Sequence, residues 1–227
     1  DDFIALPVGV GNTDFSLMLW AKIDSSDECA MQVFFGEHSS PGISNHLQFM
    51  KGSCGHGNCS ANNGSCVGLD FYEVPPNQGL FANILINNDW MFWVATYNSQ
   101  TKRRQIYADG VLVLDSIVGY GYNGGSNLQL GASYNYYSID FKGNMDNVGV
   151  WNRVLSSQEV QAYMNCPPNG NEANLMGFWN FEEGSGLTAF DLTSNGAHAI
   201  INSAAYDVNV PPQSCTLTNI NSCDSTA

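Results

Sequence analysis

The chain has 227 residues, of which 44% are hydrophobic and only 12% are charged, and its 7 Lys and Arg against 21 Asp and Glu give a formal net charge of −14. This hydrophobic content excludes an intrinsically disordered chain, and so negative a charge excludes a nucleic-acid-binding protein, because affinity for phosphates rests on Lys and Arg. The charge also disfavours anionic membranes and suits cations, neutral sugars or basic partners, although acidity of this kind also serves solubility alone.

The length of the chain fits one all-β domain, since single β-sandwiches reach this size. No stretch in the middle has the composition of a linker, so we predict one sandwich over residues 1–210 and a tail, or joint between modules, over residues 211–227. No signal peptide opens the sequence and no apolar run is long enough to cross a membrane, which indicates a mature or excised fragment without membrane insertion.

Strand patterns dominate the first half of the chain. Residues 15–23 (FSLMLWAKI) have an apolar side chain at every second position, which is the period of a strand with one face in the core. Residues 90–97 (WMFWVATY) are apolar on both faces, as in a central buried strand. Residues 105–114 consist of two apolar runs around an Asp-Gly pair, which predicts a β-hairpin.

The second half adds further strands and one helix. Ser156 and Glu159 form the Ser-x-x-Glu pattern of a capping box, apolar residues follow at helical spacing, and residues 165–168 (NCPP) end the helix. Many strands with one short helix predict an all-β fold, a two-layer antiparallel β-sandwich of the jelly-roll type. Four more segments have strand patterns: 127–131, 145–151, 177–181 and 198–202.

Seven cysteines indicate an oxidising compartment, and hence a secreted or cell-surface protein. A zinc site is a poor fit because no Cys-x-x-Cys pair exists. We prefer a disulfide between Cys166 and Cys215, which would tie down the C-terminal extension, and we leave Cys223 to a partner outside this sequence. The other four cysteines lie in the first third of the chain and allow three pairings: Cys29, Cys54, Cys59 and Cys66.

Two loop regions are candidates for recognition. The cysteine-rich loop over residues 52–68 is either a recognition loop stiffened by a bridge or a long insertion protected from proteolysis. Tyrosines gather in Gly- and Asn-rich loops further along, and exposed rings are a common platform for sugars because a pyranose face stacks on a ring. Six residues are therefore candidate ligand contacts, with packing against other loops or another subunit as the alternative: Tyr120, Tyr122, Asn123, Tyr134, Asn135 and Tyr136.

Several stretches match the motifs of one protein family. Residues 141–156 (FKGNMDNVGVWNRVLS) are similar to the signature F-x-G-x-(I/M)-D-x-V-x-(I/V)-(W/Y)-N-R-x-L-S, and residues 177–196 to W-x-F-(D/E)-E-G-S-G followed by D-x-(S/T)-(G/S)-N-G. The chain therefore resembles laminin G-like domains of the concanavalin A-like lectin/glucanase superfamily, of the kind found in large bacterial cell-surface adhesins. Shorter stretches resemble strands of these domains: 1–7, 15–22, 89–98 and 106–111.

The resemblance covers about residues 1–210 and implies a laminin G-like, concanavalin A-like sandwich. In many members the W-x-F motif comes before the strand that residues 1–7 resemble, whereas here it comes after. This order has two interpretations. The sequence is a segment of a tandem array whose ends differ from the usual domain bounds, or it is a domain whose sandwich is completed by its C-terminal strand. Residues 215–227 resemble joints between the modules of the adhesins.

The resemblance also implies a bound calcium ion. Ca²⁺ takes six to eight oxygen ligands, and the turn over residues 191–196 (DLTSNG) offers one carboxylate and several carbonyls. By the match to the family, Asp146 and Asp191 are the side-chain ligands of Ca²⁺, and Asn195 is a third candidate. The alternative is an Asx-turn over the same residues without a metal ion.

Catalysis has little support in the sequence. Glucanases of this fold carry paired carboxylates in an E-x-D-x-x-E strand, and no such run is present. Glu182 and Glu183 are adjacent, so in a strand they would point to opposite faces. We predict that the chain is not an enzyme.

Two functions remain open from the sequence. The first is a non-catalytic, extracellular, calcium-binding module for adhesion or for recognition of a glycan or an extracellular protein. The alternative is a structural subunit or repeat of an extracellular filament or surface array, which would join neighbouring modules or subunits through its termini and the odd cysteine.

Overall fold

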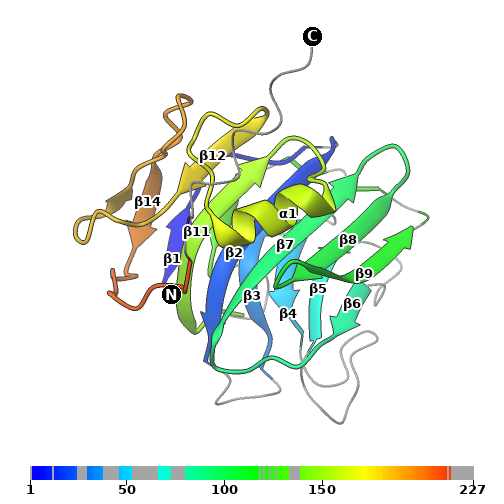
Figure 1. Cartoon of the computed structure of the whole chain (residues 1–227), viewed down its shortest axis with the longest axis horizontal. Helices are drawn as coiled ribbons and strands as arrows, with labels where there is room; N and C mark the ends of the chain where they lie inside the picture. The colour runs from blue at the N-terminus through cyan, green and yellow to red at the C-terminus, as the bar shows by residue number, and fades with distance from the viewer. Residues whose placement is uncertain are drawn as a thin grey trace.

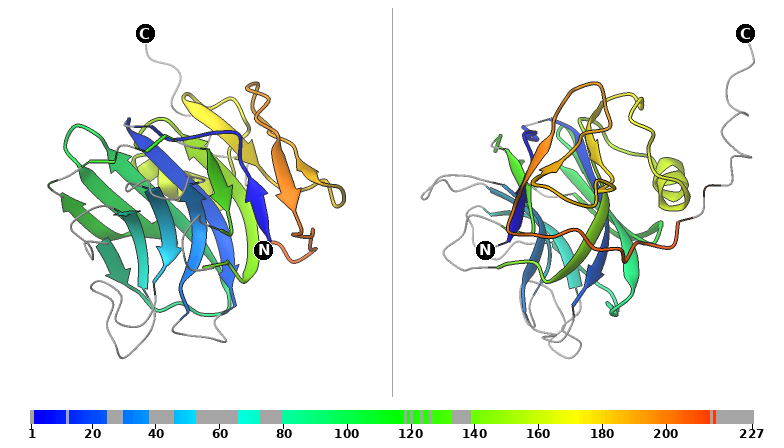
Figure 2. Two further views of the ribbon diagram at one scale, coloured as in Figure 1. Left: turned by 180° about the vertical axis from the view of Figure 1, so that it is seen from behind. Right: turned by 90° about the vertical axis from the view of Figure 1, so that its left-hand side faces the viewer.

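Two antiparallel β-sheets pack face to face, with one helix, α1 (Ser157–Asn165), on the outer face of the smaller sheet (Figures 1 and 2). This arrangement confirms the two-layer antiparallel sandwich that the sequence predicts. Within the described ranges no helix has the length and apolarity needed to cross a membrane. The structure is a computed structural model, and it describes these residues: 2–11, 13–24, 30–37, 46–52, 66–72, 80–117, 119, 121–122, 124–125, 127–132, 139–213 and 215.

The smaller sheet has six strands among the described residues, in the order β12-β11-β2-β7-β8-β9. Two predicted features are confirmed in it: β2 occupies residues 15–23, and β8 and β9 form the hairpin. Asp109 and Gly110 in the hairpin turn both have positive φ, 46° and 75°, as a type I′ turn requires. The bounds are β2 Phe15–Ile23, β7 Trp90–Asn98, β8 Arg103–Ala108, β9 Val111–Ile117, β11 Gly143–Trp151 and β12 Leu175–Trp179.

The larger sheet has eight strands in the part of the chain that the structure describes, in the order β13-β14-β1-β10-β3-β4-β5-β6. Strands β3 to β6 and β13 were not predicted from the sequence. In β4 and β5 the residues of the main core do alternate, at Leu47, Phe49, Val67 and Leu69, but each run is short. The bounds are β1 Phe3–Ala5, β3 Gln32–Glu37, β4 His46–Lys51, β5 Cys66–Tyr72, β6 Leu80–Asn83, β10 Leu128–Leu130, β13 Thr188–Ala189 and β14 Ala199–Asn202.

Strand β2 is buried on both faces. Its alternating residues from Phe15 to Ile23 lie in the main core between the sheets. Met18 and Trp20, on the opposite face, pack with Val160 of α1 in a second cluster. The sequence pattern predicts one buried face, and the helix covers the other.

The ends of four strands meet where the candidate site lies. On the smaller sheet β11 ends and β12 begins, with Trp151 paired to Leu175. On the larger sheet β1 ends and β14 begins, with Ala5 paired to Ile200. Loops that leave these ends are held by both sheets, so their side chains are mounted on a rigid frame.

Residues 203–213 and 215, here called the C-terminal strap, run from β14 toward α1 (Figure 2, orange to red). Along the way Asn144 donates to the Asp207 carboxylate (3.3 Å), and the indole N–H of Trp90 donates to the Asn209 side chain (3.2 Å). The amide of Gln213 then donates to backbone carbonyls at the end of α1 (3.2 Å each). The strap therefore connects the larger sheet to the helix on the smaller sheet.

Candidate functional site

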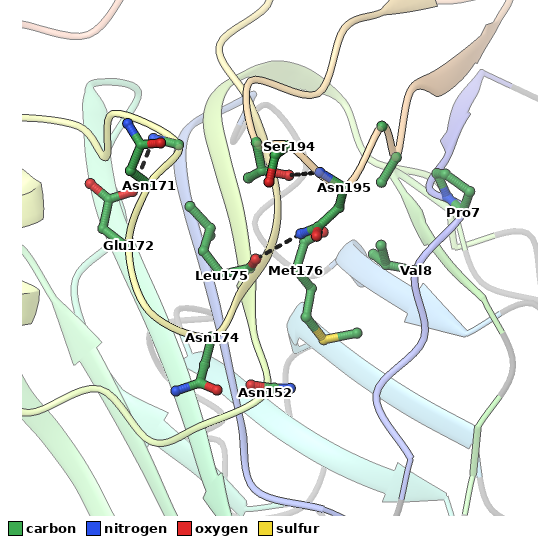
Figure 3. Close-up of a pocket in the computed structure, with 14 residues that line it drawn as sticks. Pro7, Val8, Asn152, Asn171, Glu172, Asn174, Leu175, Met176, Ser194 and Asn195 are labelled. Carbon is green, nitrogen blue, oxygen red and sulfur yellow. Dashed lines mark hydrogen bonds between the residues drawn. The ribbon is translucent and has the colours of Figure 1, made fainter.

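A cleft of about 750 Å³ opens among the loops that leave β1, β11, β12 and β14 (Figure 3). Three segments that are far apart in the sequence form its walls, at residues 7–8, 170–176 and 193–197, together with residue 152. We call it the polar cleft. Its polar lining residues are Asn152, Asn171, Glu172, Asn174, Thr193, Ser194 and Asn195.

The loop before β12 is shaped by Glu172. Its Oε1 accepts a hydrogen bond from the backbone N–H of Asn169 (2.8 Å), and its Oε2 accepts one from the N–H of Gly170 (3.0 Å). Gly170 has a φ of 93°, and a Cβ atom there would lie 2.3 Å from the backbone oxygen of Leu192. Glycine is required at this position because the loop packs directly against the neighbouring loop.

The neighbouring loop is organised by the carboxylate of Asp191, which is only 6% exposed. Its Oδ1 accepts hydrogen bonds from the N–H groups of Phe178 (3.0 Å) and Thr193 (2.9 Å). Its Oδ2 accepts from the Thr193 hydroxyl (2.6 Å) and the N–H of Ala197 (2.9 Å). Burial alone would raise the pKa of Asp191, but these hydrogen bonds hold it below its ordinary value.

Asn195 fastens the same loop to the smaller sheet. Its side-chain Nδ2 donates to the carbonyls of Leu175 (3.0 Å) and Met176 (3.1 Å), as Figure 3 shows for one of these bonds. Its Oδ1 accepts no hydrogen bond from the described residues.

Four other polar side chains on the cleft wall are exposed and make no hydrogen bond within the described part of the chain. Asn152 and Asn174 lie side by side (Figure 3), because the Asn152 N–H donates to the Asn174 carbonyl (3.0 Å). Each free amide offers two donors and one acceptor oxygen. The arrangement suits a ligand rich in hydroxyl groups. The four residues are Asn152, Asn171, Asn174 and Ser194.

The three residues predicted to bind calcium do not all line one hollow. Asn195 lines the polar cleft, whereas Asp146 lines a second hollow of about 310 Å³. Both oxygens of Asp191 already accept two hydrogen bonds each, which leaves no lone pair for a metal ion. Among the described residues no group of three or more His, Cys, Asp or Glu is placed to hold a metal. Asp191 with its saturated carboxylate therefore does not fit as a calcium ligand, and the turn at Asp191 matches the Asx-turn alternative.

Asp146 is a buried carboxyl in a different setting. Its Oδ1 accepts one hydrogen bond, from the N–H of Asn147 (2.7 Å), and Glu182 lines the same hollow. Burial raises the pKa of Asp146 to about 6, against the lowering effect of the Asn147 hydrogen bond, and the charge of Glu182 adds to the rise. A calcium ion bound in this hollow stays a prediction.

The aromatic site predicted in the loops is corrected at Tyr122. This side chain is fully buried (0% exposed), and its ring packs edge-on against Phe15 with centroids 6.0 Å apart. Its backbone N–H donates to the hydroxyl of Tyr97 (3.2 Å). A ring inside the main core cannot stack on a sugar, so Tyr122 is a core residue. The other five candidates lie outside the described residues: Tyr120, Asn123, Tyr134, Asn135 and Tyr136.

Cys166, just after α1, forms a disulfide with Cys215 at a Cα–Cα distance of 4.8 Å. This is the pairing preferred from the sequence. Cys66 on β5 is also disulfide-bonded. The cysteines that lie outside the described residues are Cys29, Cys54, Cys59 and Cys223.

Glu182 and Glu183 lie in a turn after β12, and not in a strand as the sequence argument assumed. The Glu183 carboxylate accepts hydrogen bonds from the N–H of Phe190 (2.6 Å) and the hydroxyl of Tyr206 (3.1 Å). Glu183 thus holds the chain around β13 in place.

The polar cleft was not predicted from the sequence. One signal was available, because residues 167–174 (PPNGNEAN) are rich in Pro, Asn and Gly and connect the helix to β12. Loops of this kind often carry binding residues. The pattern does not show which other loops approach this one.

Comparisons with known proteins agree with the fold. No curated protein matches the chain. A candidate carbohydrate-binding protein from Bacteroides ovatus superimposes with a TM-score of 0.68 at 17% identity, covering 89% of this chain and 56% of that protein. CBM40 of the Ruminococcus gnavus IT-sialidase, bound to α2,3-sialyllactose, gives 0.53 at 16% identity, covering 68% and 83%. A heptameric SAP-like pentraxin from Limulus polyphemus gives 0.55 at 14% identity, covering 79% and 85%.

These identities show a shared fold. The chain spans 56% of the length of the Bacteroides ovatus protein. The sequence itself matches the family model described as "Concanavalin A-like lectin/glucanases superfamily" over residues 1–161, well over half of the 227 residues. The chain therefore belongs to the concanavalin A-like lectin/glucanases superfamily.

Proposed function

We propose that the chain is a non-catalytic carbohydrate-recognition module and that its sugar site is the polar cleft. The observation that carries the proposal is the group of unbonded side chains on the cleft wall, Asn152, Asn171, Asn174 and Ser194. Family membership supports a sugar ligand, and so does the likeness in fold to a candidate carbohydrate-binding protein and to CBM40 bound to sialyllactose.

The loops present these groups in a fixed arrangement. Asp191 and Glu172 each tie their own loop through backbone N–H groups, and Asn195 ties one loop to β12. Loops that are already ordered lose less entropy when a ligand binds. The side chain of Met176 adds apolar surface to the cleft, against which the C–H face of a sugar ring can pack.

Hydrolysis of a glycosidic bond ordinarily uses two carboxyl groups on opposite sides of that bond. The described lining of the polar cleft holds a single carboxyl group, on Glu172, and this group serves the loop backbone. This supports binding without catalysis. The Cys166–Cys215 disulfide supports a place of action outside the cell, where such a module would attach its parent protein to glycans.

The proposal is tested by calorimetric titration of the whole chain with lactose, cellotetraose, arabinotriose and mannotriose. We expect at least one of them to bind. Asn152→Ala combined with Asn171→Ala should weaken that binding about tenfold or more, because each lost hydrogen bond costs about 1 kcal/mol. The melting temperature should stay unchanged, since both side chains are exposed and unbonded.

The matched control is Gln158→Ala, which removes an exposed amide from α1, away from the cleft lining. It should bind like the unaltered chain. If the double variant bound every glycan as tightly as the control does, the polar cleft would not be the sugar site.

A further inference from the structure

We propose that the polar cleft selects uncharged sugars and rejects glycans that carry a carboxylate. This inference rests on the proposed function, and it names the class of ligand for the same site. Two observations support it. The carboxylate of Glu172 lies in the cleft wall, and the cation beside the cleft, Arg153, forms an ion pair with Glu159.

Glu172 brings a fixed negative charge to the cleft. Backbone N–H groups of Asn169 and Gly170 each donate to a different oxygen, which holds the carboxylate in one orientation. Each oxygen keeps one further acceptor position. A sugar hydroxyl can donate there, whereas a sugar carboxylate would be repelled.

The cation beside the cleft is already paired. Arg153 follows Asn152 in the chain, and its guanidinium donates to both oxygens of Glu159, at 2.6 and 3.0 Å. Its Nε donates to the backbone carbonyl of Ala173 (3.1 Å). Two of its nitrogens are thus committed to a carboxylate and the third to a loop, so it is not presented to a ligand.

No Lys, Arg or His is among the described residues that line the polar cleft. Proteins that recognise a carboxylate commonly use Arg, whose paired N–H groups match the two oxygens. The net charge of −14 adds a long-range repulsion of anions. The amides that remain are suited to hydroxyl groups, which both donate and accept hydrogen bonds.

This inference separates the chain from one of its structural neighbours. CBM40 of the Ruminococcus gnavus IT-sialidase is bound to α2,3-sialyllactose, an acidic trisaccharide. The shared fold does not imply that this chain binds the same ligand, because the groups that line a binding site are determined by its loops.

The test compares pairs of glycans that differ in a carboxylate, using the whole chain. Lactose is paired with 3′-sialyllactose, and galactan with polygalacturonan, in calorimetric titrations at low salt. For each pair in which one member binds, we expect the neutral glycan to bind about fivefold or more tightly than the acidic one. Added salt should narrow this difference, since it screens the repulsion.

Two substitutions test the electrostatic origin of the preference. Glu172→Gln removes the charge while keeping the size, and Asn171→Lys places a cation at an exposed, unbonded position on the wall. Each should shift the affinity ratio toward the acidic glycan. Gln158→Lys on α1 is the matched control, because it changes the net charge as Asn171→Lys does but away from the cleft lining, and it should leave the ratio unchanged.

Two failures are distinguishable. If the unaltered chain bound an acidic glycan as tightly as its neutral partner, and Asn152→Ala with Asn171→Ala weakened that binding, the ligand class would be wrong while the proposed function stood. If no glycan of either kind bound, or the double variant changed nothing, both the proposed function and this inference would be overturned.

Discussion

Asp191 accepts hydrogen bonds from three residues around it, Phe178, Thr193 and Ala197. The carboxylate oxygens, which were predicted to bind a calcium ion, thus accept hydrogen bonds from the protein. Removing it would leave buried N–H groups without partners, and each such group costs about 1–3 kcal/mol. At the scale of single residues, the shape of one cleft wall depends on this side chain.

Asp191→Ala should lower the free energy of unfolding by about 3 kcal/mol, measured by urea denaturation. The loss should be the same with EDTA and with added calcium, because hydrogen bonds and not a metal ion hold the loop. Thr193→Val removes the 2.6 Å bond that the hydroxyl donates to Asp191 and the 3.2 Å bond that it accepts from the N–H of Asn195, and should cost about 1–2 kcal/mol. The opposite result would be a calcium-dependent rise in the stability of the unaltered chain that Asp191→Ala abolishes, as the sequence-based prediction of a metal site requires.

Helix α1 illustrates how one element is joined to the site. Ser156 accepts from the Glu159 N–H (3.3 Å), and Glu159 accepts from the Ser156 N–H (2.8 Å), which completes the capping box. Glu159 also forms an ion pair with Arg153 (2.6 Å), and Arg153 bonds the carbonyl of Ala173 in the loop that leads into the cleft. One carboxylate therefore connects the start of the helix with the wall of the polar cleft.

The pH dependence of the free energy of unfolding should show the contribution of the Glu159 carboxylate. Burial alone would raise the pKa of Glu159, but hydrogen bonds from Arg153 and Ser156 lower it from 4.5 to about 2. A carboxyl with a lowered folded pKa stabilises the fold fully above its unfolded pKa, and this stabilisation is lost as the pH falls through the folded pKa. The relevant window therefore runs from pH 4.5 down to about 2.

Glu159→Gln should reduce the free energy of unfolding at neutral pH by about 1 kcal/mol or less, because the paired side chains are partly exposed. The difference between the variant and the unaltered chain should shrink as the pH falls through the window. Urea denaturation at neutral pH, at about pH 4.5 and at about pH 3 measures it. A difference that stayed constant or grew toward low pH would contradict the assignment.

At the scale of the whole molecule, two connections hold the layers together. The main core lies between the sheets, and the C-terminal strap passes from the larger sheet to the helix on the smaller one. The disulfide fixes the strap at the end of α1, and Cys166 and Cys215 are 49 positions apart in the sequence. Such a link stabilises chiefly by restricting the unfolded chain.

Cys166→Ser combined with Cys215→Ser should therefore lower the free energy of unfolding by about 2–4 kcal/mol. For a chain of this size the melting temperature should fall by roughly 5–10 °C. The far-ultraviolet circular dichroism should stay that of a β-sandwich, and glycan binding should persist, since neither cysteine lines the polar cleft. An unchanged melting temperature would show that the strap is held by its hydrogen bonds alone.

Local patterns in the sequence were enough to predict much of the fold. The alternation in β2, the Asp-Gly turn between β8 and β9, and the capping box of α1 each involve residues close together in the chain. Their conformations depend on short-range sterics and hydrogen bonds, which can be predicted from residues that are neighbours in the sequence. The family motifs over residues 141–156 and 177–196 extended this prediction to the architecture.

The candidate site depends on contacts that only the tertiary structure provides. Asn152, Asn174 and Ser194 belong to three different loops and meet because the strands of both sheets end together. Tyr122 lies in a polar, Gly-rich stretch, yet its ring is buried against Phe15, more than a hundred residues earlier in the chain. By itself the sequence determined an acidic, antiparallel sandwich, because periodicity, turn chemistry and composition are local properties. Which side chains are buried, which carboxylate is saturated and which amides stay free was decided by long-range packing.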